Sequence, residues 1–363
     1  MPHVFIIGAG PAGSTAAILL AREPGFGVTL VEQHRFPRDK VCGECLSALG
    51  IDVLGRMGVV PRAGDFDPVV LTRSVIHAPD GSNVSLPLPR PMWGVPRARF
   101  DSLLLAAARD AGARVLQPAR CERVNGAVTV RSLESNRLET LRADVVLVAD
   151  GKGALLPPRR TPTRDFGIKA HFSNVNGPRD AIELFGVRGC YGGLAAVAGD
   201  RWNAAFSVPE SRLRGCDGNL DRVFAQMLAE STALRLRFRS ATRVTPWLAA
   251  PLPRFNVARR FEHHIIPIGN AAAALEPIGG EGMGVAMRSA ELAAEELIRS
   301  HRTGRAPRTD VMRARYVRLW RVRSVVCRAT ALAVSSPGVA RIGVRVIPGP
   351  LSRLALRLTG KSR

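Results

Sequence analysis

The feature that most constrains this chain is a glycine turn between two apolar strands within residues 3–32. The first apolar strand, 3–7, leads into a turn, and a helix of small residues (14–22) and a second apolar strand (28–31) follow. The second strand ends at Glu32. This order of strand, turn, helix, strand and acid is that of the dinucleotide-binding βαβ unit. The turn reads Gly8-Ala9-Gly10-Pro11-Ala12-Gly13.

Each glycine of the turn has its own predicted task. Gly8 permits the tight turn, Gly10 lets the backbone approach a pyrophosphate, and Gly13 lets the helix pack close to the strand. The free N–H groups and the positive dipole end of the helix attract phosphates. Glu32 would accept hydrogen bonds from ribose hydroxyls and repel a 2′-phosphate, so the unit predicts FAD or NAD and excludes NADP. Pro11, Ala12 and the neighbouring Gln33 are assigned to the same site.

The positive charge of the chain is concentrated at one end. The net charge is +22, and residues 299–363 carry +15 of it, with Asp310 as their one acid. Apolar residues alternate with arginines at 311–333 and 339–358, which predicts basic amphipathic helices suited to an anionic membrane surface. The alternative is a solvated basic helix that packs on the body. We expect no nucleic-acid partner, because no nucleic-acid-binding fold accompanies the charge.

Other global features are those of an ordinary intracellular protein. The sequence has no run of 18 apolar residues, and its first buried strand begins by residue 4, so we expect neither a membrane span nor a signal peptide. Six cysteines among 363 residues do not form a disulfide scaffold. We therefore expect a cytoplasmic protein, with a peripheral position at the inner face of the membrane as the alternative that the tail suggests.

Apolar periodicity predicts an α/β fold with discontinuous domains. Buried parallel strands are expected at 144–149 and 265–268, helices at 48–57, 102–111, 220–230 and 281–300, and Asp101 or Ser102 as the N-cap of the second helix. Short strands interrupted by proline and glycine are expected at 61–91, and further strands between 166 and 208. The segments group into a Rossmann-type dinucleotide domain (1–60, 95–160 and 255–300), an inserted antiparallel β-sheet substrate domain (61–94 and 161–254) and a basic helical tail (301–363).

Five stretches of the sequence together resemble one group of proteins. They are the turn 8–13, the segment 36–44 (Phe-Pro-Arg-Asp-Lys-Val-Cys-Gly-Glu), Arg97 ahead of Phe100-Asp101, Ala149-Asp150-Gly151, and 269–272 with 277–283. In these stretches the chain resembles flavoprotein monooxygenases and reductases of the p-hydroxybenzoate hydroxylase fold. Within that group it is most similar to the geranylgeranyl reductase family. The resemblance extends to about residue 300 and implies FAD as the cofactor.

The resemblance also implies which residues hold the flavin. Asn270 stands where the family has an acid that holds a ribityl hydroxyl, and an amide can also bond a hydroxyl. The turn 276–283 would present N–H groups to the flavin N1/O2 edge at the start of a long helix. Arg97 resembles the family arginine that reaches the cofactor, with Arg99 as the competing choice. The remaining cofactor residues that we assign are Lys40, Cys42, Asp150, Gly151, Gly269, Ala271, Pro277, Gly280, Glu281, Gly282 and Met283.

The usual serine and arginine after the aspartate-glycine motif are replaced by Ala154 and Pro157, which weakens the case for hydroxylase-type handling of NADPH. The sequence has no second GxGxxG motif. NAD(P)H or another electron donor must therefore dock transiently.

The stretch Cys42-Gly43-Glu44-Cys45 has several interpretations. A redox disulfide is one, and a zinc site that recruits His263-His264 is another. The resemblance places Cys42 at the flavin and substrate, as a proton donor or cavity wall, with Glu44 as the alternative donor. Inert loop cysteines are the remaining interpretation.

Two aromatic residues of the predicted β-sheet domain, Tyr191 and Trp202, either pack within the sheet or line a substrate tunnel. We count Tyr191 among the candidate catalytic residues and expect His171 to be structural.

These features together predict an FAD-dependent oxidoreductase that acts on a hydrophobic substrate and reduces carbon–carbon double bonds of an isoprenoid or prenyl lipid. Hydride would come from reduced flavin, and the proton from Cys42 or Glu44. An FAD-dependent monooxygenase that tailors an aromatic or polyketide metabolite is the second hypothesis. A flavin halogenase is the third, although the Trp-x-Trp-x-Ile-Pro signature of that branch is absent. A non-catalytic protein with a relic flavin site is a hypothesis of another class.

Overall fold

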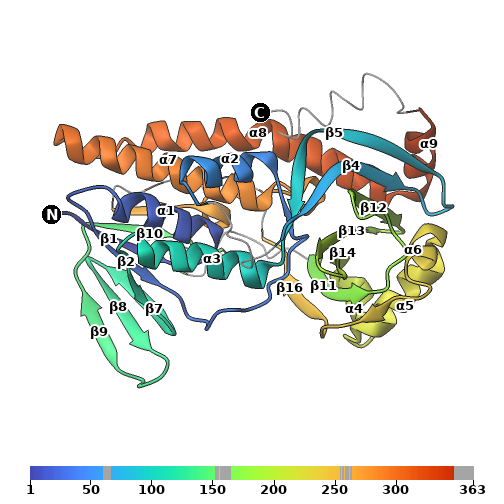
Figure 1. Cartoon of the computed structure of the whole chain (residues 1–363), viewed down its shortest axis with the longest axis horizontal. Helices are drawn as coiled ribbons and strands as arrows, with labels where there is room; N and C mark the ends of the chain where they lie inside the picture. Colours follow the sequence, from blue (N-terminus) through green and yellow to red (C-terminus); the bar gives the residue numbers. More distant parts are fainter. Residues whose placement is uncertain are drawn as a thin grey trace.

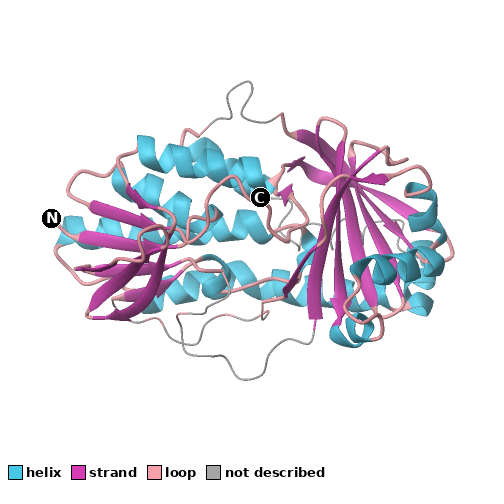
Figure 2. Ribbon diagram, turned by 90° about the horizontal axis from the view of Figure 1, so that it is seen from below, coloured by secondary structure: helices cyan, strands magenta, loops and turns pink. Residues whose placement is uncertain are grey.

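The computed structural model describes residues 1–59, 67–151, 155, 165–253, 255, 257, 261 and 264–346. A parallel sheet with its helices lies at one end of the molecule and a larger, mixed but mostly antiparallel sheet at the other, and long helices run between them (Figure 1). Figure 2 shows the same two sheets from below, with the helices between them. The predicted fold class, α/β with a Rossmann-type domain, an inserted β-sheet and C-terminal helices, is confirmed.

The parallel sheet has its strands in the order β17-β10-β1-β2-β6. Because side chains alternate along a strand, the two faces of β1 carry different partners. Val4 and Ile6 join a core with the helices, whereas Phe5 and Ile7 join a second core with a three-stranded sheet, β7-β8-β9. The bounds of these strands are β1 His3–Ile7, β2 Gly27–Val31, β6 Arg114–Leu116, β7 Ala119–Asn125, β8 Ala127–Ser132, β9 Leu138–Leu141, β10 Val145–Val148 and β17 Ile265–Pro267.

Helices α1 (Pro11–Ala21), α3 (Arg97–Asp110) and α7 (Gly282–Thr303) cover the first face. Helix α3 begins five residues earlier than expected, so the predicted N-cap at Asp101 or Ser102 is wrong. Pro96 occupies the N-cap position. Asp101 lies inside the helix because it pairs with Arg97 one turn before it, at 2.6 Å.

The nine-stranded sheet has the order β15-β11-β14-β13-β12-β4-β5-β3, and β16 pairs with β11. One face packs on α4 (Glu210–Arg214), α5 (Leu220–Glu230) and α6 (Thr232–Arg237) around Phe172, Phe206 and Phe224. The bounds of these strands are β3 Cys45–Leu46, β4 Val69–His77, β5 Asn83–Gly94, β11 Asp165–Ser173, β12 Ala181–Val187, β13 Cys190–Ala198, β14 Arg201–Pro209, β15 Thr242–Arg243 and β16 Leu248–Pro251.

Strands β4 and β5 are continuous over nine and twelve residues, so the prediction of short interrupted strands is wrong. Three prolines, Pro87, Pro89 and Pro91, sit at alternate, exposed positions of β5. On its outer side β5 pairs only with the two-residue β3, at Trp93 and Gly94. Proline is tolerated there because the rest of that edge, within the described chain, has no strand to receive its N–H groups.

The tail contributes two helices, α8 (Thr309–Ser335) and α9 (Pro337–Val346). Helix α7 packs against α8 and also against α2 (Ala48–Arg56). Tyr316 and Trp320 of α8 are buried in the core of the parallel-sheet domain, and Cys327 and Ala331 in that of the nine-stranded sheet. The tail therefore bridges both domains. No helix in the described parts of the chain has the length and apolar character needed to cross a bilayer. The end of the second predicted tail helix, 347–358, lies outside the described residues, as do His263, Ala154 and Pro157.

Candidate functional site

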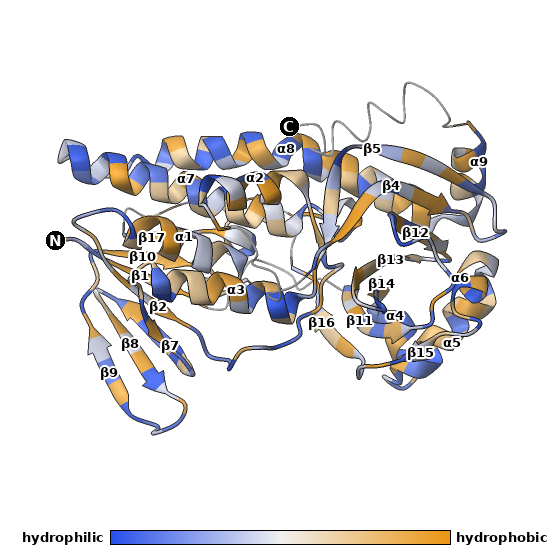
Figure 3. Cartoon of the chain, in the orientation of Figure 1, coloured by the Kyte–Doolittle hydropathy of each residue, from blue (hydrophilic) through white to orange (hydrophobic). Residues whose placement is uncertain are grey.

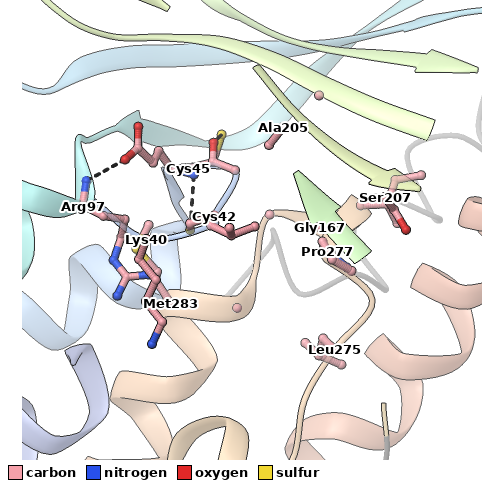
Figure 4. A pocket seen from close by; sticks show the side chains of 18 of the residues that line it. Lys40, Cys42, Cys45, Arg97, Gly167, Ala205, Ser207, Leu275, Pro277 and Met283 are labelled. Atoms are coloured by element: carbon pink, nitrogen blue, oxygen red, sulfur yellow. Dashed lines mark hydrogen bonds between the residues drawn. The ribbon is translucent and has the colours of Figure 1, made fainter. Parts of the chain in front are cut away.

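One cavity extends from the glycine turn after β1 to the inner face of the nine-stranded sheet. Figure 4 shows Lys40, Cys42 and Arg97 at its centre, with Gly167, Ala205 and Ser207 of the sheet across from them. The lining comes from segments distant in sequence: the turn at 10–12, the loop 40–45, Arg97, Gly151, strands β11–β14, and 275–286. The fold thus brings most of the predicted site residues together.

The glycine turn has the geometry that its sequence predicts. Gly8 has φ +99°, and a Cβ there would lie 2.6 Å from the carbonyl oxygen of Ala149. A Cβ on Gly13 would lie 1.8 Å from the carbonyl oxygen of Gly8. At Gly10, by contrast, a Cβ would meet no atom within 4 Å. Gly8 and Gly13 are therefore required by the fold, and Gly10 leaves open space beside Pro11 and Ala12 at the cavity wall.

Glu32 follows the last residue of β2 and lies next to the glycine turn. It is buried, and its two carboxylate oxygens accept hydrogen bonds from the N–H groups of Ala9 (3.0 Å) and His34 (2.9 Å). Each oxygen keeps a second lone pair, which is what a ribose hydroxyl would use. Gln33, beside it, is exposed and does not line the cavity.

The second half of the site follows β17. Gly269 has φ +58°, and its N–H donates to Ser289 Oγ at 2.8 Å. The next residue, Asn270, is exposed and lines the cavity, whereas Ala271 is buried. These residues form the 3₁₀ turn η1 (Gly269–Ala271). The Asn270 amide is therefore placed where it can bond a polar group in the cavity.

A second helix N-terminus opens on the same cavity. The 3₁₀ turn η2 (Pro277–Gly279) ends at Gly280, which has φ +65°, and Glu281 occupies the N-cap position of α7. Glu281 itself is buried away from the cavity, which Gly282 and Met283 line. The N-termini of α1 and α7 thus both present a positive dipole end to this space.

The residues present fit FAD. A Cβ added at the cavity-lining Gly43 or Gly282 would meet no atom within 4 Å, as at Gly10, so bare backbone faces the cavity at three points. A planar ring system and a pyrophosphate both need such close backbone approach. The two helix N-termini complement phosphate and the negative charge of reduced flavin, and Asn270 can bond a ribityl hydroxyl.

Two cations lie beside one another in the cavity, Lys40 and Arg97 (Figure 4). Arg97 is buried and makes a two-pronged pair with Asp101, at 2.8 and 2.6 Å. Burial works against its charge, but Asp101 and a hydrogen bond to Cys42 outweigh burial and raise the pKa of Arg97. Burial, helped by the charge of Arg97, lowers the pKa of Lys40 to about 8. Arg99, the competing choice for the cofactor arginine, is exposed on α3 and does not line the cavity.

Asp150 and Gly151 follow β10. The Asp150 carboxylate accepts a hydrogen bond from the Leu155 N–H at 3.2 Å, so it holds the chain after the strand, and it does not itself line the cavity. Gly151 does line the cavity, with φ +75°. A Cβ there would lie 3.4 Å from Lys40 Nζ, so Gly151 leaves space for the lysine.

The loop that carries Cys42 is held by a buried polar cluster. Glu44 is fully buried, with φ +55°. Its Oε1 accepts from Lys169 Nζ (2.6 Å) and the Arg97 N–H (2.8 Å), and its Oε2 lies 2.7 Å from His171 Nε2. Burial alone would raise the pKa of Glu44. The hydrogen bonds and positive charges of His171 and Lys169 outweigh burial, so the pKa is lowered and the carboxylate is ionised at neutral pH.

Cys42 lies next to this cluster and faces the cavity. Its carbonyl accepts a hydrogen bond from Asn203 Nδ2 at 3.0 Å, and its Sγ lies 3.3 Å from the Glu44 N–H. With Arg97 on its other side, the thiol is fixed by groups from three parts of the chain. Of the six cysteines, all free thiols, Cys42 is the one that is not buried.

The alternative interpretations of the cysteine loop find less support. Cys42 and Cys45 are not bonded to each other. His264 lies at the start of β17, so it is at the edge of the parallel sheet opposite the cavity. Asp39, Glu44 and His171 are close enough together to hold a metal ion. However, Lys169 Nζ already lies within 3.3 Å of both carboxylates and supplies the positive charge.

Tyr191 lines the cavity from β13. Its hydroxyl donates to Glu276 Oε1 at 2.6 Å, and Glu276 Oε2 accepts from Arg328 of α8 at 2.8 Å. Burial and the neighbouring carboxylate raise the pKa of Tyr191. Of the two interpretations of Trp202, packing within the sheet holds, because the side chain lies on the other face of the sheet, in the core with the helices, and does not line the cavity.

Sequence reasoning missed Lys169, Asn203, Glu276 and Arg328. Lys169 carried one signal: it is one of only four lysines and lies in a strand that is otherwise mostly apolar. Glu276 is the first residue of the predicted flavin turn, but no role was assigned to its side chain. The pairing of Glu276 with Tyr191 and Arg328 has no local signature.

Comparison with known proteins agrees with this geometry. Residues 1–161 match the model of the FAD binding domain family. This part of the chain is therefore similar to FAD-binding domains. The protein is thus an FAD-dependent flavoprotein, as the glycine turn and the late turn before α7 together predict.

Several relatives match beyond this domain. A menaquinone reductase of Mycolicibacterium smegmatis is 28% identical over 325 residues, covering 80% of this chain and 75% of its own. The conditioned medium factor receptor 1 of Dictyostelium discoideum is also 28% identical, over 82% of this chain, which spans 63% of that protein. A digeranylgeranylglycerophospholipid reductase of Methanothrix thermoacetophila is 34% identical over 41% of this chain and 39% of its own.

Among solved structures, the flavin-dependent brominase Bmp2 has a TM-score of 0.84 with 19% identity, covering 99% of this chain and 94% of that one. At this identity the likeness concerns the fold alone.

Proposed function

We propose that the protein is an FAD-dependent reductase that saturates carbon–carbon double bonds of an isoprenoid or prenylated lipid. One observation carries the proposal: a single accessible thiol, Cys42, is fixed at the junction between the flavin half of the cavity and its sheet-lined half. The names of two relatives, a menaquinone reductase and a digeranylgeranylglycerophospholipid reductase, support the same class of reaction.

The reaction adds a hydride and a proton across a double bond. FAD, when bound and reduced, supplies the hydride. The thiol proton of Cys42 goes to the other carbon, and the thiolate recovers a proton from solvent. Arg97, which hydrogen-bonds Cys42, stabilises the thiolate in between. Glu44 is less suited to donate, because its lowered pKa and its three bonds keep it ionised and occupied.

The sheet side of the cavity suits an apolar chain. Five neighbouring positions of the sheet that line the cavity carry small residues, which leave space for a substrate above the sheet. Ile182 and Leu184 add larger apolar side chains to the same lining. Tyr191 and its hydrogen-bonded partner Glu276 place a polar pair at the same surface. The small residues are Gly167, Gly193, Ala195, Ala205 and Ser207.

The electron donor is proposed to dock transiently, as NAD(P)H or another reductant. The cavity of the described chain takes its glycine turn from the FAD-binding domain, and the sequence provides no second turn of this kind.

The test is product analysis with photoreduced, FAD-loaded protein under anaerobic conditions, with menaquinone and geranylgeranyl lipids as substrates. We expect products heavier by one hydrogen pair per reduced bond. Cys42→Ala should lower the rate by about 10²–10⁴-fold, as expected for loss of a general acid. The matched control, Cys216→Ala, removes a buried thiol that does not line the cavity and should leave the rate nearly unchanged.

One outcome would refute the proposed reaction, and another would refute only the role of Cys42. In the first, the lipids stay unchanged, and phenols incubated with the reduced protein in air are oxygenated. This result would identify a monooxygenase instead. Full reductase activity in Cys42→Ala would remove the proton-donor role while leaving the reduction itself standing.

A further inference from the structure

The tail helices α8 and α9 carry exposed apolar side chains that no part of the described chain covers. We propose that α8 and α9 form a docking surface for an anionic lipid bilayer. We call this surface the tail face and define it by six strongly exposed apolar side chains. They are Val322, Val325, Leu332, Val339, Ile342 and Val346.

The tail face is unusual for a surface helix, because α8 has two apolar stripes. Its inner stripe, Cys327, Ala331 and Val334, is buried against the nine-stranded sheet. Val322 lies three residues before Val325, and Leu332 lies seven residues after it, so these three side chains share one side of the helix. That side differs from the side of the buried inner stripe. A helix that packs on a protein surface needs one such stripe. The second stripe contributes nothing to the folding of α8.

Exposed apolar side chains are concentrated here. Within the described residues, twelve large apolar side chains are strongly exposed, and the six of the tail face all lie within residues 322–346, at 48–73% exposure. The other six are scattered over the N-terminus, β4, the β8–β9 hairpin, α6 and the segment before β16. Scattered single residues need no explanation, whereas a concentration of them marks an interaction site.

The charges around the tail face decide its partner. Residues 309–346 contain eight arginines and a single acid, Asp310. Arg318 and Arg321 are exposed on the same side of α8 as Val325, and Arg345 is exposed on α9. Among the residues that the structure describes, these three arginines form no salt bridge, so their charge remains available. Figure 3 shows polar and apolar residues alternating along α8 and α9.

A second copy of this chain would meet the same arginines and be repelled. A nucleic acid would satisfy the arginines but not the six apolar residues. An anionic bilayer satisfies both, because arginines pair with lipid phosphates while apolar side chains enter the boundary of the acyl region. This inference does not rest on the reaction proposed above, since it needs no catalysis.

The experiment is vesicle flotation of the full-length, FAD-loaded protein. Vesicles of 30% phosphatidylglycerol in phosphatidylcholine should bind it, and pure phosphatidylcholine vesicles should bind it at least about tenfold more weakly. The apolar variant Val325→Ser/Leu332→Ser/Ile342→Ser should lose about tenfold in partitioning. The charge variant Arg318→Gln/Arg321→Gln/Arg345→Gln should bind as weakly to anionic vesicles as the unchanged protein binds to neutral ones.

Matched controls carry the same changes elsewhere. Leu133→Ser/Leu138→Ser replaces exposed leucines of the β8–β9 hairpin, and Arg123→Gln/Arg137→Gln/Arg142→Gln replaces exposed arginines on or beside β7 and β9. Both should bind like the unchanged protein. All substituted side chains are exposed, so unfolding midpoints should stay the same in every variant.

Three results would overturn the proposal. The first is no binding to anionic vesicles. The second is binding that the charge variant loses but the apolar variant keeps, because that pattern identifies a polyanion such as nucleic acid. The third is a dimer in sedimentation that the apolar variant dissociates, because the tail face would then cover a second copy of the chain.

Discussion

Replacing Glu44 by glutamine tests the central polar cluster most directly. The change keeps the shape of the side chain and removes its charge, which leaves Lys169 buried with only the partly exposed Asp39 at 3.3 Å. At an effective dielectric constant of 20, two charges 2.6 Å apart attract by about 6 kcal/mol before desolvation is subtracted. Breaking a buried ion pair by removing one partner costs about 3–5 kcal/mol. We expect Glu44→Gln to lower the free energy of unfolding by this amount.

The assay is urea denaturation of the apo-protein, followed by tryptophan fluorescence, in a double-mutant cycle with Lys169→Met. Because Lys169→Met removes the charge that Glu44→Gln leaves unpaired, the double variant should be about 1–3 kcal/mol more stable than additivity predicts. The matched control is Asp180→Asn, which breaks the exposed pair with Arg73 and should cost less than about 1 kcal/mol.

The same cycle has a definite pH dependence. The folded-state pKa of Glu44 lies below its ordinary value, so its contribution to stability is fully present above the ordinary glutamate pKa of about 4.3. That contribution disappears as the pH falls through the lower folded value. The stability difference between the unchanged protein and Glu44→Gln should therefore shrink in acid. A cost below about 1 kcal/mol for Glu44→Gln at pH 7, or strict additivity with Lys169→Met, would refute the role of the cluster.

Two further predictions concern FAD binding by the apo-protein, measured by flavin fluorescence. With a pKa of about 8, Lys40 loses its charge as the pH rises through that value. FAD affinity should fall over the same range, and Lys40→Met should bind weakly with a flatter pH profile, while the exposed-site control Arg99→Met behaves like the unchanged protein. Gly10→Ala should lower FAD affinity at least about tenfold without loss of stability, since its Cβ meets no protein atom within 4 Å. Gly13→Ala should lower stability by about 1–3 kcal/mol, since its Cβ would lie 1.8 Å from a backbone oxygen. Equal stability of the two alanine variants would contradict the assignment of their separate tasks.

The fold was largely predictable because its signals are local. The glycine turn, the apolar run at 145–148 and the helix at 220–230 each fix their own conformation by residue type and spacing. The errors arose where a contact with another side chain, and not the local sequence, determines where an element begins. Asp101 looks like an N-cap, but its pairing with Arg97 places it one turn inside α3.

The cofactor half of the site was predictable for the same reason, whereas the cluster around Cys42 was not. Glu44 meets Lys169 across 125 residues of sequence, and only the assembled sheet brings them together. Trp202 and Asn203 show that neighbouring residues of one strand can differ in whether they reach the site. Trp202 lies one position from Asn203, which bonds the Cys42 carbonyl, yet the alternation of side chains along β14 sends it to the opposite face.

The course of α8 has a consequence for how the protein can be divided. Its inner side chains Cys327 and Ala331 pack with Ile278 of the turn before α7, and Arg328 pairs with Glu276 behind Tyr191. The cavity next to residues 1–161 is therefore supported from behind by a segment that begins almost 150 residues later. The tail is not an appendage that truncation could remove cleanly. A fragment ending before residue 309 would leave Ile278 without its packing partners and Glu276 without Arg328, so we expect it to lose the support of the cavity wall.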